Sequence, residues 1–346
     1  MTTPIHIGIL GAGSISDTHA RAALEIPGTQ ISAVYGRNFE KAQRLAALYG
    51  GTAFDSLESF LDHRPMDLVA IGSPSALHGD QGIAAVQRGL HVLIEKPLDI
   101  TTAKADELIA AADRAGVKLG VFFQDRLKPD VVTLKTMIDA GVLGRPILAS
   151  GHVRWYRPPE YYGGSRWRGT FALDGGGALI NQAIHTVDLM LYVFGPIASV
   201  DARAGTQLHK IEVEDTVVAT LQFKNGALGV FQASTAVFPG YARRVELTGS
   251  NGTATLEHDS LSGIDLKEPD ARFPPPVAAA GSGAAVNAAS PVVGDATPHR
   301  RILEDFINAI RTSGRPVCDG VDGRRSVAVV EAIYASARAQ GPVTIE

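Results

Sequence analysis

Glycines recur at a tight spacing near the start of the chain. Gly11-Ala12-Gly13-Ser14-Ile15-Ser16 directly follows an apolar run and opens a helical pattern. Glycine allows a tight turn, and the first N–H groups of the following helix can bind a pyrophosphate. Ser16 replaces the third glycine of this motif and is small enough for close helix–strand packing. The motif predicts a dinucleotide site, with cofactor contacts from Gly11, Gly13, Ser14 and Ile15.

The end of the second apolar run bears on which dinucleotide is bound. Sites that prefer NAD usually place an Asp or Glu there, which binds the ribose 2′-hydroxyl. In this chain Gly36 stands at that position and Arg37 follows it. An arginine without a carboxylate suits a 2′-phosphate, so we expect Arg37 to contact the cofactor and to favour NADP. The alternative is that Arg37 stacks on the adenine and that NAD is accepted.

Two side chains far apart in the sequence suit the oxidation of an alcohol by such a cofactor. Lys96 can stabilise a developing alkoxide, and His185 can accept the hydroxyl proton near neutral pH. Asn181 lies four residues before His185, so on a helix the two side chains share a face. Asn181 is neutral and can only orient the imidazole. We expect Asp188, three residues after His185, to be structural.

Residues 154–168, RWYRPPEYYGGSRWR, gather both tryptophans of the chain with three tyrosines and four arginines. Aromatic faces bind sugar rings, and arginine binds carboxylate or phosphate through two hydrogen bonds. One interpretation is a pocket wall for an acidic sugar or a sugar nucleotide, with equal weight given to a contact with a second subunit. In the first interpretation the substrate contacts come from Tyr156, Arg157, Tyr162 and Arg166.

Short apolar runs alternate with helical patterns over residues 1–125, which predicts a doubly wound α/β domain of the Rossmann type. The expected strands are Ile5–Leu10, Gln30–Tyr35, Leu68–Ile71, His91–Ile94 and Lys118–Phe123. The expected helices between them are Ile15–Glu25, Phe39–Tyr49, Gly79–Arg88 and Ala103–Ala115.

Residues 126–346 predict an α+β domain with a large, mainly antiparallel open sheet, because strand patterns follow one another without helices between them. The expected strands are Pro146–Tyr156, Ser199–Gln207, Asp215–Phe223, Ala227–Thr235, Ala242–Thr248 and Gly252–Glu257. The expected helices are Pro129–Ala140, Gly177–Val193, His299–Arg311 and Asp322–Ala339. Residues 272–298, rich in Pro, Ala, Gly and Ser, are expected to be a flexible insertion.

The composition excludes several kinds of partner. The formal net charge of -4 gives no positive field for nucleic acid or for an anionic membrane, and no apolar run approaches a membrane span of ~20 residues. No Cys/His cluster has metal-ligand spacing, so we expect no metal. The single cysteine, Cys318, is expected to be a small buried residue. Its isolation and the lack of a leader pattern favour a cytoplasmic protein.

Three further motifs carry a resemblance to a known family. They are Gly89-Leu90-His91-Val92-Leu93-Ile94-Glu95-Lys96-Pro97-Leu98, then Gly175-Gly176-Gly177 with His185-Thr186-Val187-Asp188, and the closing Asp305-Phe306, Arg315-Pro316 and Ala332-Ile333-Tyr334. With the glycine motif, they closely resemble the Gfo/Idh/MocA family of oxidoreductases, which includes inositol dehydrogenases and nucleotide-sugar 3-dehydrogenases. The resemblance covers the whole chain apart from the 272–298 insertion.

The resemblance implies roles for particular residues. Lys96 would lie beside the nicotinamide and hydrogen-bond the reacting hydroxyl, and Glu95 would help to place Lys96 and to line the cofactor site. Asn181 and His185 match a pair, written Asp and His in many members, that faces the substrate. Further matches on the cofactor side are Ser73, His78, Gln124, Trp167 and Arg168.

The resemblance also implies the activity: hydride transfer between NADP or NAD and a hydroxyl-bearing carbon of a sugar, sugar acid, nucleotide sugar or polyol. The active site is expected between the two domains, and the protein is expected to form a homodimer or homotetramer. Two alternatives remain, a non-catalytic dinucleotide-binding sensor and a sugar–sugar oxidoreductase with a tightly held cofactor. Retention of Lys96 and His185 favours an enzyme over a sensor.

Overall fold

The computed structural model describes residues 4–164, 167–276 and 295–345, and the chain forms two compact units. The first unit comprises Met1–Gln124 and Val292–Arg324, and the second comprises Asp125–Pro291 and Arg325–Glu346. This division differs from the expected second domain, 126–346, because residues 292–324 cluster with the first unit. Arg166 and residues 277–294 of the expected insertion lie outside the described residues.

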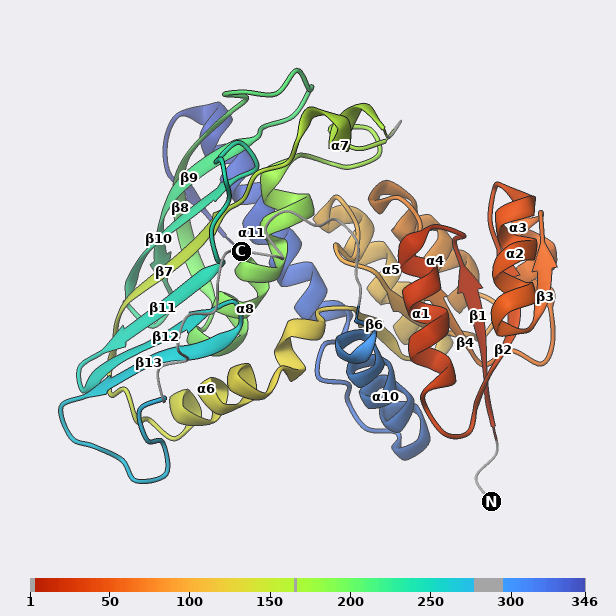
Figure 1. Cartoon of the computed structure of the whole chain (residues 1–346), viewed down its shortest axis with the longest axis horizontal. Helices are drawn as coiled ribbons and strands as arrows, with labels where there is room; N and C mark the ends of the chain where they lie inside the picture. Colours follow the sequence, from red (N-terminus) through yellow and green to blue (C-terminus); the bar gives the residue numbers. More distant parts are fainter. Residues whose placement is uncertain (1–3, 165–166, 277–294, 346) are drawn as a thin grey trace. The chain divides into compact units, whose positions relative to one another are not determined.

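A six-stranded parallel sheet forms the core of the first unit, in the order β3-β2-β1-β4-β5-β6 (Figure 1). Its strands are β1 (Ile5–Leu10), β2 (Thr29–Tyr35), β3 (Thr52–Phe54), β4 (Leu68–Ile71), β5 (His91–Ile94) and β6 (Leu119–Val121). Apolar residues such as Ile9 and Val69 are fully buried, since helices cover both faces. The strand order reverses between β1 and β4, and sheets of this kind bind ligands outside the carboxyl ends of the strands there. The expected Rossmann unit is confirmed.

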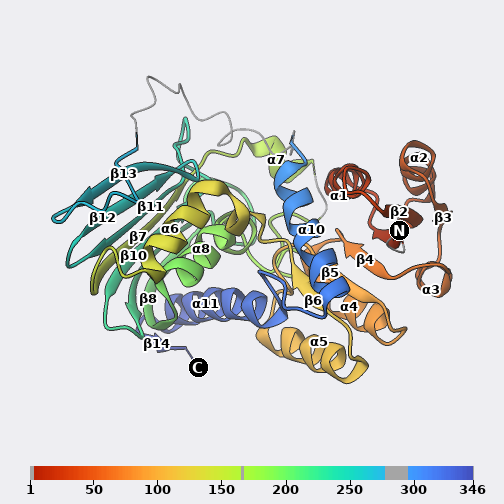
Figure 2. The same ribbon diagram turned by 90° about the horizontal axis from the view of Figure 1, so that it is seen from below.

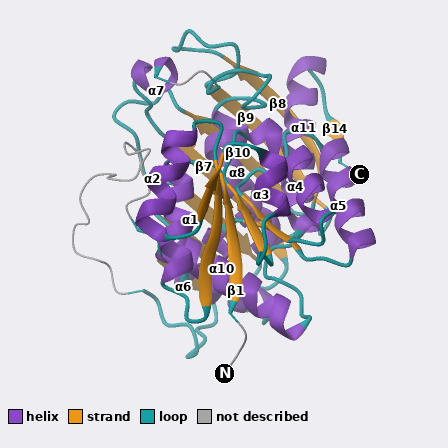
Figure 3. Cartoon of the chain, turned by 90° about the vertical axis from the view of Figure 1, so that its right-hand side faces the viewer, coloured by secondary structure: helices purple, strands orange, loops and turns teal. Residues whose placement is uncertain are grey.

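Helices α1 and α2 cover one face of this sheet, and α4 and α5 cover the other (Figure 3). The helices of the unit are α1 (Ser14–Leu24), α2 (Phe39–Tyr49), α3 (Leu57–Asp62), α4 (His78–Val86), α5 (Thr102–Ala115) and α10 (Thr297–Thr312). Asn38 and Thr101 cap α2 and α5 by accepting a hydrogen bond from a first-turn N–H. Helix α10 lies beside α1 (Figure 2) and packs Phe306 against Gly120, where a Cβ would lie 2.7 Å from the ring.

The second unit is built on an eight-stranded sheet in the order β13-β12-β11-β7-β10-β9-β8-β14. Its strands are β7 (Pro146–Arg154), β8 (Ile197–Gly205), β9 (Thr216–Phe223), β10 (Leu228–Ser234), β11 (Arg244–Gly249), β12 (Gly252–Glu257), β13 (Ser260–Leu266) and β14 (Val343–Thr344). Only the neighbours β7 and β10 run parallel. The expected mainly antiparallel sheet is therefore confirmed.

One face of this sheet packs against helices, namely α6 (Pro129–Asp139), α8 (Ile184–Phe194) and α11 (Gly320–Ala339) (Figure 2). The side chains of β9 alternate accordingly, with Val217 and Ala219 buried and Val218 55% exposed. A short helix, α7 (Pro159–Gly163), and a π-helix, η3 (Ala178–Ala183), complete the unit. Among the helices of the described residues, none is long and apolar enough to cross a membrane.

Candidate active site

The glycine turn after β1 has the form that a pyrophosphate needs. Gly11 has φ +120°, and a Cβ there would lie 2.7 Å from the Gly72 carbonyl oxygen, so this position requires glycine. Gly13 begins α1 without a side-chain cap, which leaves first-turn N–H groups to bind a ligand. A Cβ on Gly13 would meet nothing within 4 Å, so the packing of the chain itself does not account for this glycine. These features fit the phosphates of a dinucleotide.

Close packing explains why no acid follows β2. A Cβ on Gly36 would lie 2.6 Å from the Cβ of Ala12 in the glycine turn, so Asp or Glu could not stand there without moving the turn. Arg37 is the next residue, and it is exposed. The residues at this end of β2 therefore offer a ribose or its phosphate a cation and no carboxylate.

His78 joins the segments that follow β4 and β5. Its Nε2 lies 2.9 Å from the Ser73 carbonyl oxygen, and its Nδ1 lies 2.7 Å from that of Pro97. Burial lowers the pKa of His78, while these two carbonyls act in the opposite direction. The ring thereby ties the Ser73 segment to Pro97, the residue after the half-buried Lys96.

Glu95 points into the first unit and binds two histidines. His19 Nε2, from α1, lies 2.9 Å from Glu95 Oε1, and His299 Nε2, from α10, lies 3.2 Å from the same oxygen. Burial alone would raise the pKa of Glu95, but the two histidines hold it well below its usual range. The other oxygen, Oε2, accepts the backbone N–H of Lys96 at 3.3 Å. Glu95 thereby fixes the backbone from which Lys96 projects.

The same three residues are the one group among the described residues whose donor atoms lie close enough together to hold a metal ion. A histidine that ligates a metal almost always donates its other ring N–H to a carbonyl or carboxylate. Within the described part of the chain, Nδ1 of His19 and of His299 is buried without a hydrogen-bond partner. The group is therefore better explained as two imidazoles hydrogen-bonded to a carboxylate.

Gln124 follows β6, at the carboxyl edge of the parallel sheet, as expected for a cofactor-side residue. Its Oε1 is buried and accepts no hydrogen bond from the described residues. A buried acceptor of this kind is costly unless a ligand or water supplies a donor.

In the second unit, the triple glycine leads into the π-helix η3. The buried carboxylate of Glu214 accepts the backbone N–H groups of Gly177 and Leu179 at 3.0 and 2.9 Å, and the Tyr334 hydroxyl at 3.0 Å. A Cβ on Gly176 would lie 2.1 Å from the Tyr334 hydroxyl, and one on Gly177 would lie 1.9 Å from the Glu214 carbonyl oxygen. These two glycines thus permit close packing within the chain.

His185 lies in the first turn of α8, next to a buried cluster of charges. Its Nδ1 is 3.6 Å from Oδ2 of Asp125, and the same oxygen is 2.7 Å from Arg243 Nη2. Asp188 instead forms a buried ion pair with Arg126, with contacts of 2.8 and 2.6 Å. The structural role expected for Asp188 agrees with this ion pair.

Asn181 takes part in a chain of polar side chains. Its Nδ2 donates to Asp174 at 2.5 Å, and its Oδ1 accepts from Gln182 at 2.8 Å. Gln182 also donates to the Tyr161 hydroxyl at 2.7 Å and accepts from Arg157 at 2.9 Å. The segment 154–168 is thereby tied to the helix turn that carries Asn181.

Aromatic rings hold two of the arginines of this segment. Arg157 lies 5.1 Å from the Trp155 ring and is 4% exposed, and Arg168 lies 4.5 Å from the Tyr161 ring. Arg157 is thus held by contacts within the chain, and its direct contact with an anionic substrate stays a prediction. The remaining expected contacts are placed as follows: Tyr156 packs on Phe238, Tyr162 hydrogen-bonds Thr235, and Trp167 lies 5.4 Å from Arg168.

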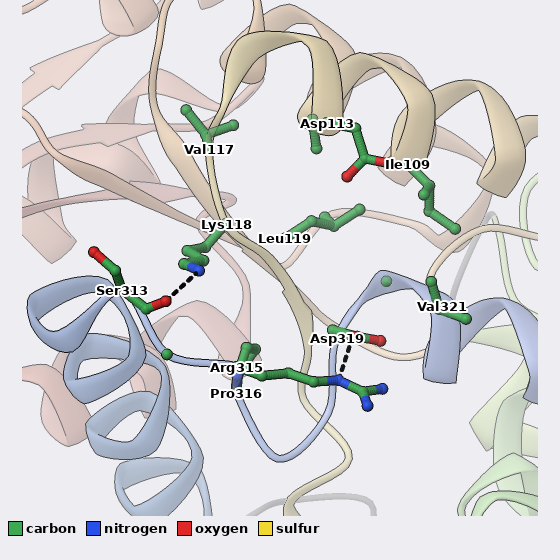
Figure 4. A pocket seen from close by; sticks show the side chains of 13 residues that line it. Ile109, Asp113, Val117, Lys118, Leu119, Ser313, Arg315, Pro316, Asp319 and Val321 are labelled. Atoms are coloured by element: carbon green, nitrogen blue, oxygen red, sulfur yellow. Dashed lines mark hydrogen bonds and ion pairs between the residues drawn. The ribbon is translucent and has the colours of Figure 1, made fainter.

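A pocket of about 360 Å³ lies elsewhere, at the amino end of β6 (Figure 4). Lys118 and Arg315 line it, but Lys118 donates to the Ser313 carbonyl and Arg315 pairs with Asp319. Its lining includes none of the residues expected to bind cofactor or substrate. In a parallel sheet, ligands bind at the opposite, carboxyl ends of the strands.

Sequence reasoning missed three acidic residues that support the expected ones. Asp125 faces His185, Asp174 binds Asn181, and Glu214 holds the start of η3. Asp125 could have been noticed in the sequence, since it lies shortly after the last parallel strand, β6, and next to Arg126. Asp174 and Glu214 had none, because only the fold brings them to these partners.

Comparison with known proteins shows similarity along the whole chain. A model described as an oxidoreductase family with an NAD-binding Rossmann fold matches residues 5–123, and one for the GFO/IDH/MocA C-terminal domain matches 131–255. The crystal structure of the WlbA dehydrogenase from Bordetella pertussis, in complex with NADH and UDP-GlcNAcA, has a TM-score of 0.88 and 30% identity, covering 99% of both chains.

Two curated relatives extend this similarity. D-glucoside 3-dehydrogenase of Escherichia coli is 27% identical over 97% of this chain and 96% of its own length. Myo-inositol 2-dehydrogenase of Thermotoga maritima is 26% identical over 72% of this chain and 74% of its own length.

Fold, site and similarity together define an NAD(P)-dependent dehydrogenase or reductase that acts on CH–OH groups. The chain belongs to the Gfo/Idh/MocA family of oxidoreductases. The similar WlbA structure contains NADH, so these relatives do not support the preference for NADP that Arg37 suggested.

Proposed function

We propose that the substrate is an acidic sugar or a sugar nucleotide. The observation that carries this proposal is the group of arginines and aromatic rings in the described part of residues 154–168, which Arg157 and Tyr161 join to Gln182, the residue next to Asn181. Cations and aromatic rings beside a candidate catalytic helix suit a ring that bears a carboxylate or a phosphate. The relative WlbA, which binds UDP-GlcNAcA, supports this class of substrate.

In this proposal His185 accepts the proton of the hydroxyl and Lys96 stabilises the charge on its oxygen. During oxidation the hydroxyl O–H bond breaks and its proton passes to His185 Nε2, while the C–H bond breaks and the carbonyl forms. NAD(P), when bound, supplies the acceptor for the hydride that leaves this carbon. The Lys96 ammonium stabilises the negative charge that develops on the oxygen. Glu95 and the loop held by His78 position Lys96.

The finer choice of cofactor rests on Gly36 and Arg37. We infer a preference for NADP, because the end of β2 carries a cation and has no room for an acid. The NADH in the WlbA structure argues for the alternative, in which Arg37 stacks on the adenine. We also infer a cytoplasmic location, because the chain has a single cysteine, Cys318, and so cannot form an internal disulfide.

We further propose that the protein is a homodimer or homotetramer that associates through the exposed face of its eight-stranded sheet. Leu148, Val230 and Leu228 point out of this face on β7 and β10, and Leu228 is 61% exposed. Val218 on β9 adds to the same apolar strip. An apolar sheet face of this kind is favourable to cover and typical of an interface.

Two alternatives keep the dinucleotide but change its use. A sensor would bind NAD(P) without turnover, and a sugar–sugar oxidoreductase would retain its cofactor through gel filtration. The presence of both Lys96 and His185 favours catalysis, because a sensor needs neither.

A substrate panel tests the proposal. Uronic acids, UDP-sugars, neutral aldoses and polyols are each incubated with NAD⁺ and NADP⁺, and the reduced cofactor is followed at 340 nm. Acidic sugars or sugar nucleotides are expected to give the highest kcat/KM. A clear preference for a neutral polyol would contradict the substrate class, and no turnover with firm cofactor binding would favour the sensor.

A further inference from the structure

The carboxylate that faces the candidate base comes from an unexpected part of the chain. Asn181 occupies the position where many relatives are expected to place an acid, and its amide is engaged by Asp174 and Gln182. Asp125 instead points its Oδ2 at Nδ1 of His185, 3.6 Å away. The two side chains are only 8% and 13% exposed, so solvent screens their interaction weakly.

Asp125 is held in this position from two sides. Arg243 Nη2 lies 2.7 Å from Oδ2, and Lys128 Nζ lies 2.8 Å from Oδ1. Burial alone would raise the pKa of Asp125, but Arg243, His185 and Lys128 together hold it well below its usual range. Asp125 is therefore a fixed negative charge at the pH of the reaction.

The other charges around this cluster are balanced. Asp259, in the turn between β12 and β13, pairs with both Arg243 and Lys128. One helical turn after His185, the charge of Asp188 is matched by that of Arg126. The carboxylates of Asp125 and Asp259 balance the positive charges of Arg243 and Lys128. Of these four groups, Asp125 is the one that faces the imidazole of His185.

We propose that Asp125 is the positioning residue of His185: it keeps the ring proton on Nδ1 and so presents Nε2 as the atom that accepts the substrate's hydroxyl proton. A proton taken up at Nε2 makes an imidazolium, and the negative charge 3.6 Å from Nδ1 stabilises it. The inference rests on the proposed role of His185 as the base. In it, Asp125 replaces the acid that Asn181 does not supply.

The tautomer of His185 in the unmodified protein is the first test. Imidazole ¹⁵N and ¹³C resonances of the full chain are recorded without ligand, and the His185 signals are assigned as those missing from His185→Gln. We expect a neutral ring protonated at Nδ1, because that N–H faces Asp125. A ring protonated at Nε2 would overturn the proposal.

The second test compares two carboxylates of the same cluster. Asp125→Asn should lower the His185 titration midpoint by about one pH unit, the low end of the effect of a close charge, since Arg243 and Lys128 offset part of it. Asp259→Asn is the matched control, because Asp259 binds the same two cations, Arg243 and Lys128. It should leave the midpoint near the wild-type value. An equal shift in both variants, or none in Asp125→Asn, would overturn the proposal.

Failure of the proposed function would look different. If His185→Gln transferred hydride as fast as the wild type, the base would lie elsewhere. The NMR titration would still report whether Asp125 acts on His185, so the two failures are distinguishable.

Discussion

Glu95 and Asp125 are buried carboxylates beside the two candidate catalytic residues, and neighbours keep both ionised. Glu95 lies within ion-pair distance of His19 and His299, and Asp125 lies within ion-pair distance of Arg243 and Lys128. In each case burial alone would raise the carboxyl pKa. The histidines beside Glu95 and the positive charges beside Asp125 hold these pKa values well below their usual range. Both groups therefore remain charged at neutral pH. A pH dependence of hydride transfer near neutrality should then arise from a group such as His185, not from these carboxylates.

Arg37 gives a prediction about the cofactor. Arg37→Ala should weaken NADPH binding by about 1.5–3 kcal/mol, because it removes a charge-assisted hydrogen bond to the 2′-phosphate, and should change NADH binding little. Dissociation constants from fluorescence titration of both cofactors provide the measurement. The control is Arg44→Ala, which removes an exposed arginine of α2. Equal losses for NADPH and NADH would assign Arg37 to the adenine instead.

At the level of elements, the helix that carries the candidate catalytic residues begins with a π-helical turn, and a side chain from another segment binds its first N–H groups. The π-helix η3 precedes α8, and its first N–H groups have no side-chain cap of their own. Glu214 supplies the acceptors from the segment before β9, and Tyr334 of α11 donates to the same carboxylate. Two segments distant in sequence, one with Glu214 and one with Tyr334, thus set the start of the helix that carries Asn181 and His185.

Glu214→Gln tests this support. The amide keeps one acceptor oxygen and turns an NH₂ group toward backbone N–H donors, which leaves at least one buried donor unsatisfied. We expect a loss of about 2–3 kcal/mol in the free energy of unfolding, measured by urea denaturation. Glu212→Gln, two residues away and exposed, should change it by less than about 0.5 kcal/mol. Similar small effects from both would show that Glu214 does not hold η3.

The elements that could be predicted from the sequence differ from those that could not in length and in burial. Strands β1, β4 and β5 were predicted at their observed bounds, because their apolar runs are buried on both faces and end at Gly, Asp or Glu. Strand β3 has three residues and β14 has two, too few to show a pattern. The π-helical form of η3 was also missed, since it depends on packing against Glu214 and Tyr334.

Prediction of the candidate site shows the same limit. Gly11, Lys96 and His185 could be proposed as site residues because short motifs mark them. The partners of these residues, such as His299 for Glu95 and Asp125 for His185, come from other segments, and only the fold shows which of them meet. The ring of Trp155 and the hydrogen bond to Gln182, which hold Arg157, could not be found from the sequence either.

At the level of the whole molecule, the exposed sheet face of the second unit predicts self-association. Leu228→Asp should lower the sedimentation coefficient toward that of a monomer, because it places a charge in the apolar strip with Leu148 and Val230. The control is Leu48→Asp, on α2, which removes a comparably exposed leucine. A wild-type protein that sediments as a monomer would contradict the proposed interface, as would an unchanged oligomer in Leu228→Asp.

The central claim is that Lys96 and His185 carry out the hydride transfer, and single-turnover kinetics tests it most directly. Reduced cofactor is followed after mixing enzyme and oxidised cofactor with the fastest sugar of the panel, and cofactor binding is measured separately. Lys96→Met should slow the transfer by at least about 10²-fold with little change in cofactor affinity, and His185→Ala should have a similar or milder effect. Lys224→Met, in the exposed turn after β9, should transfer hydride at the wild-type rate. Transfer near the wild-type rate in Lys96→Met would contradict the account.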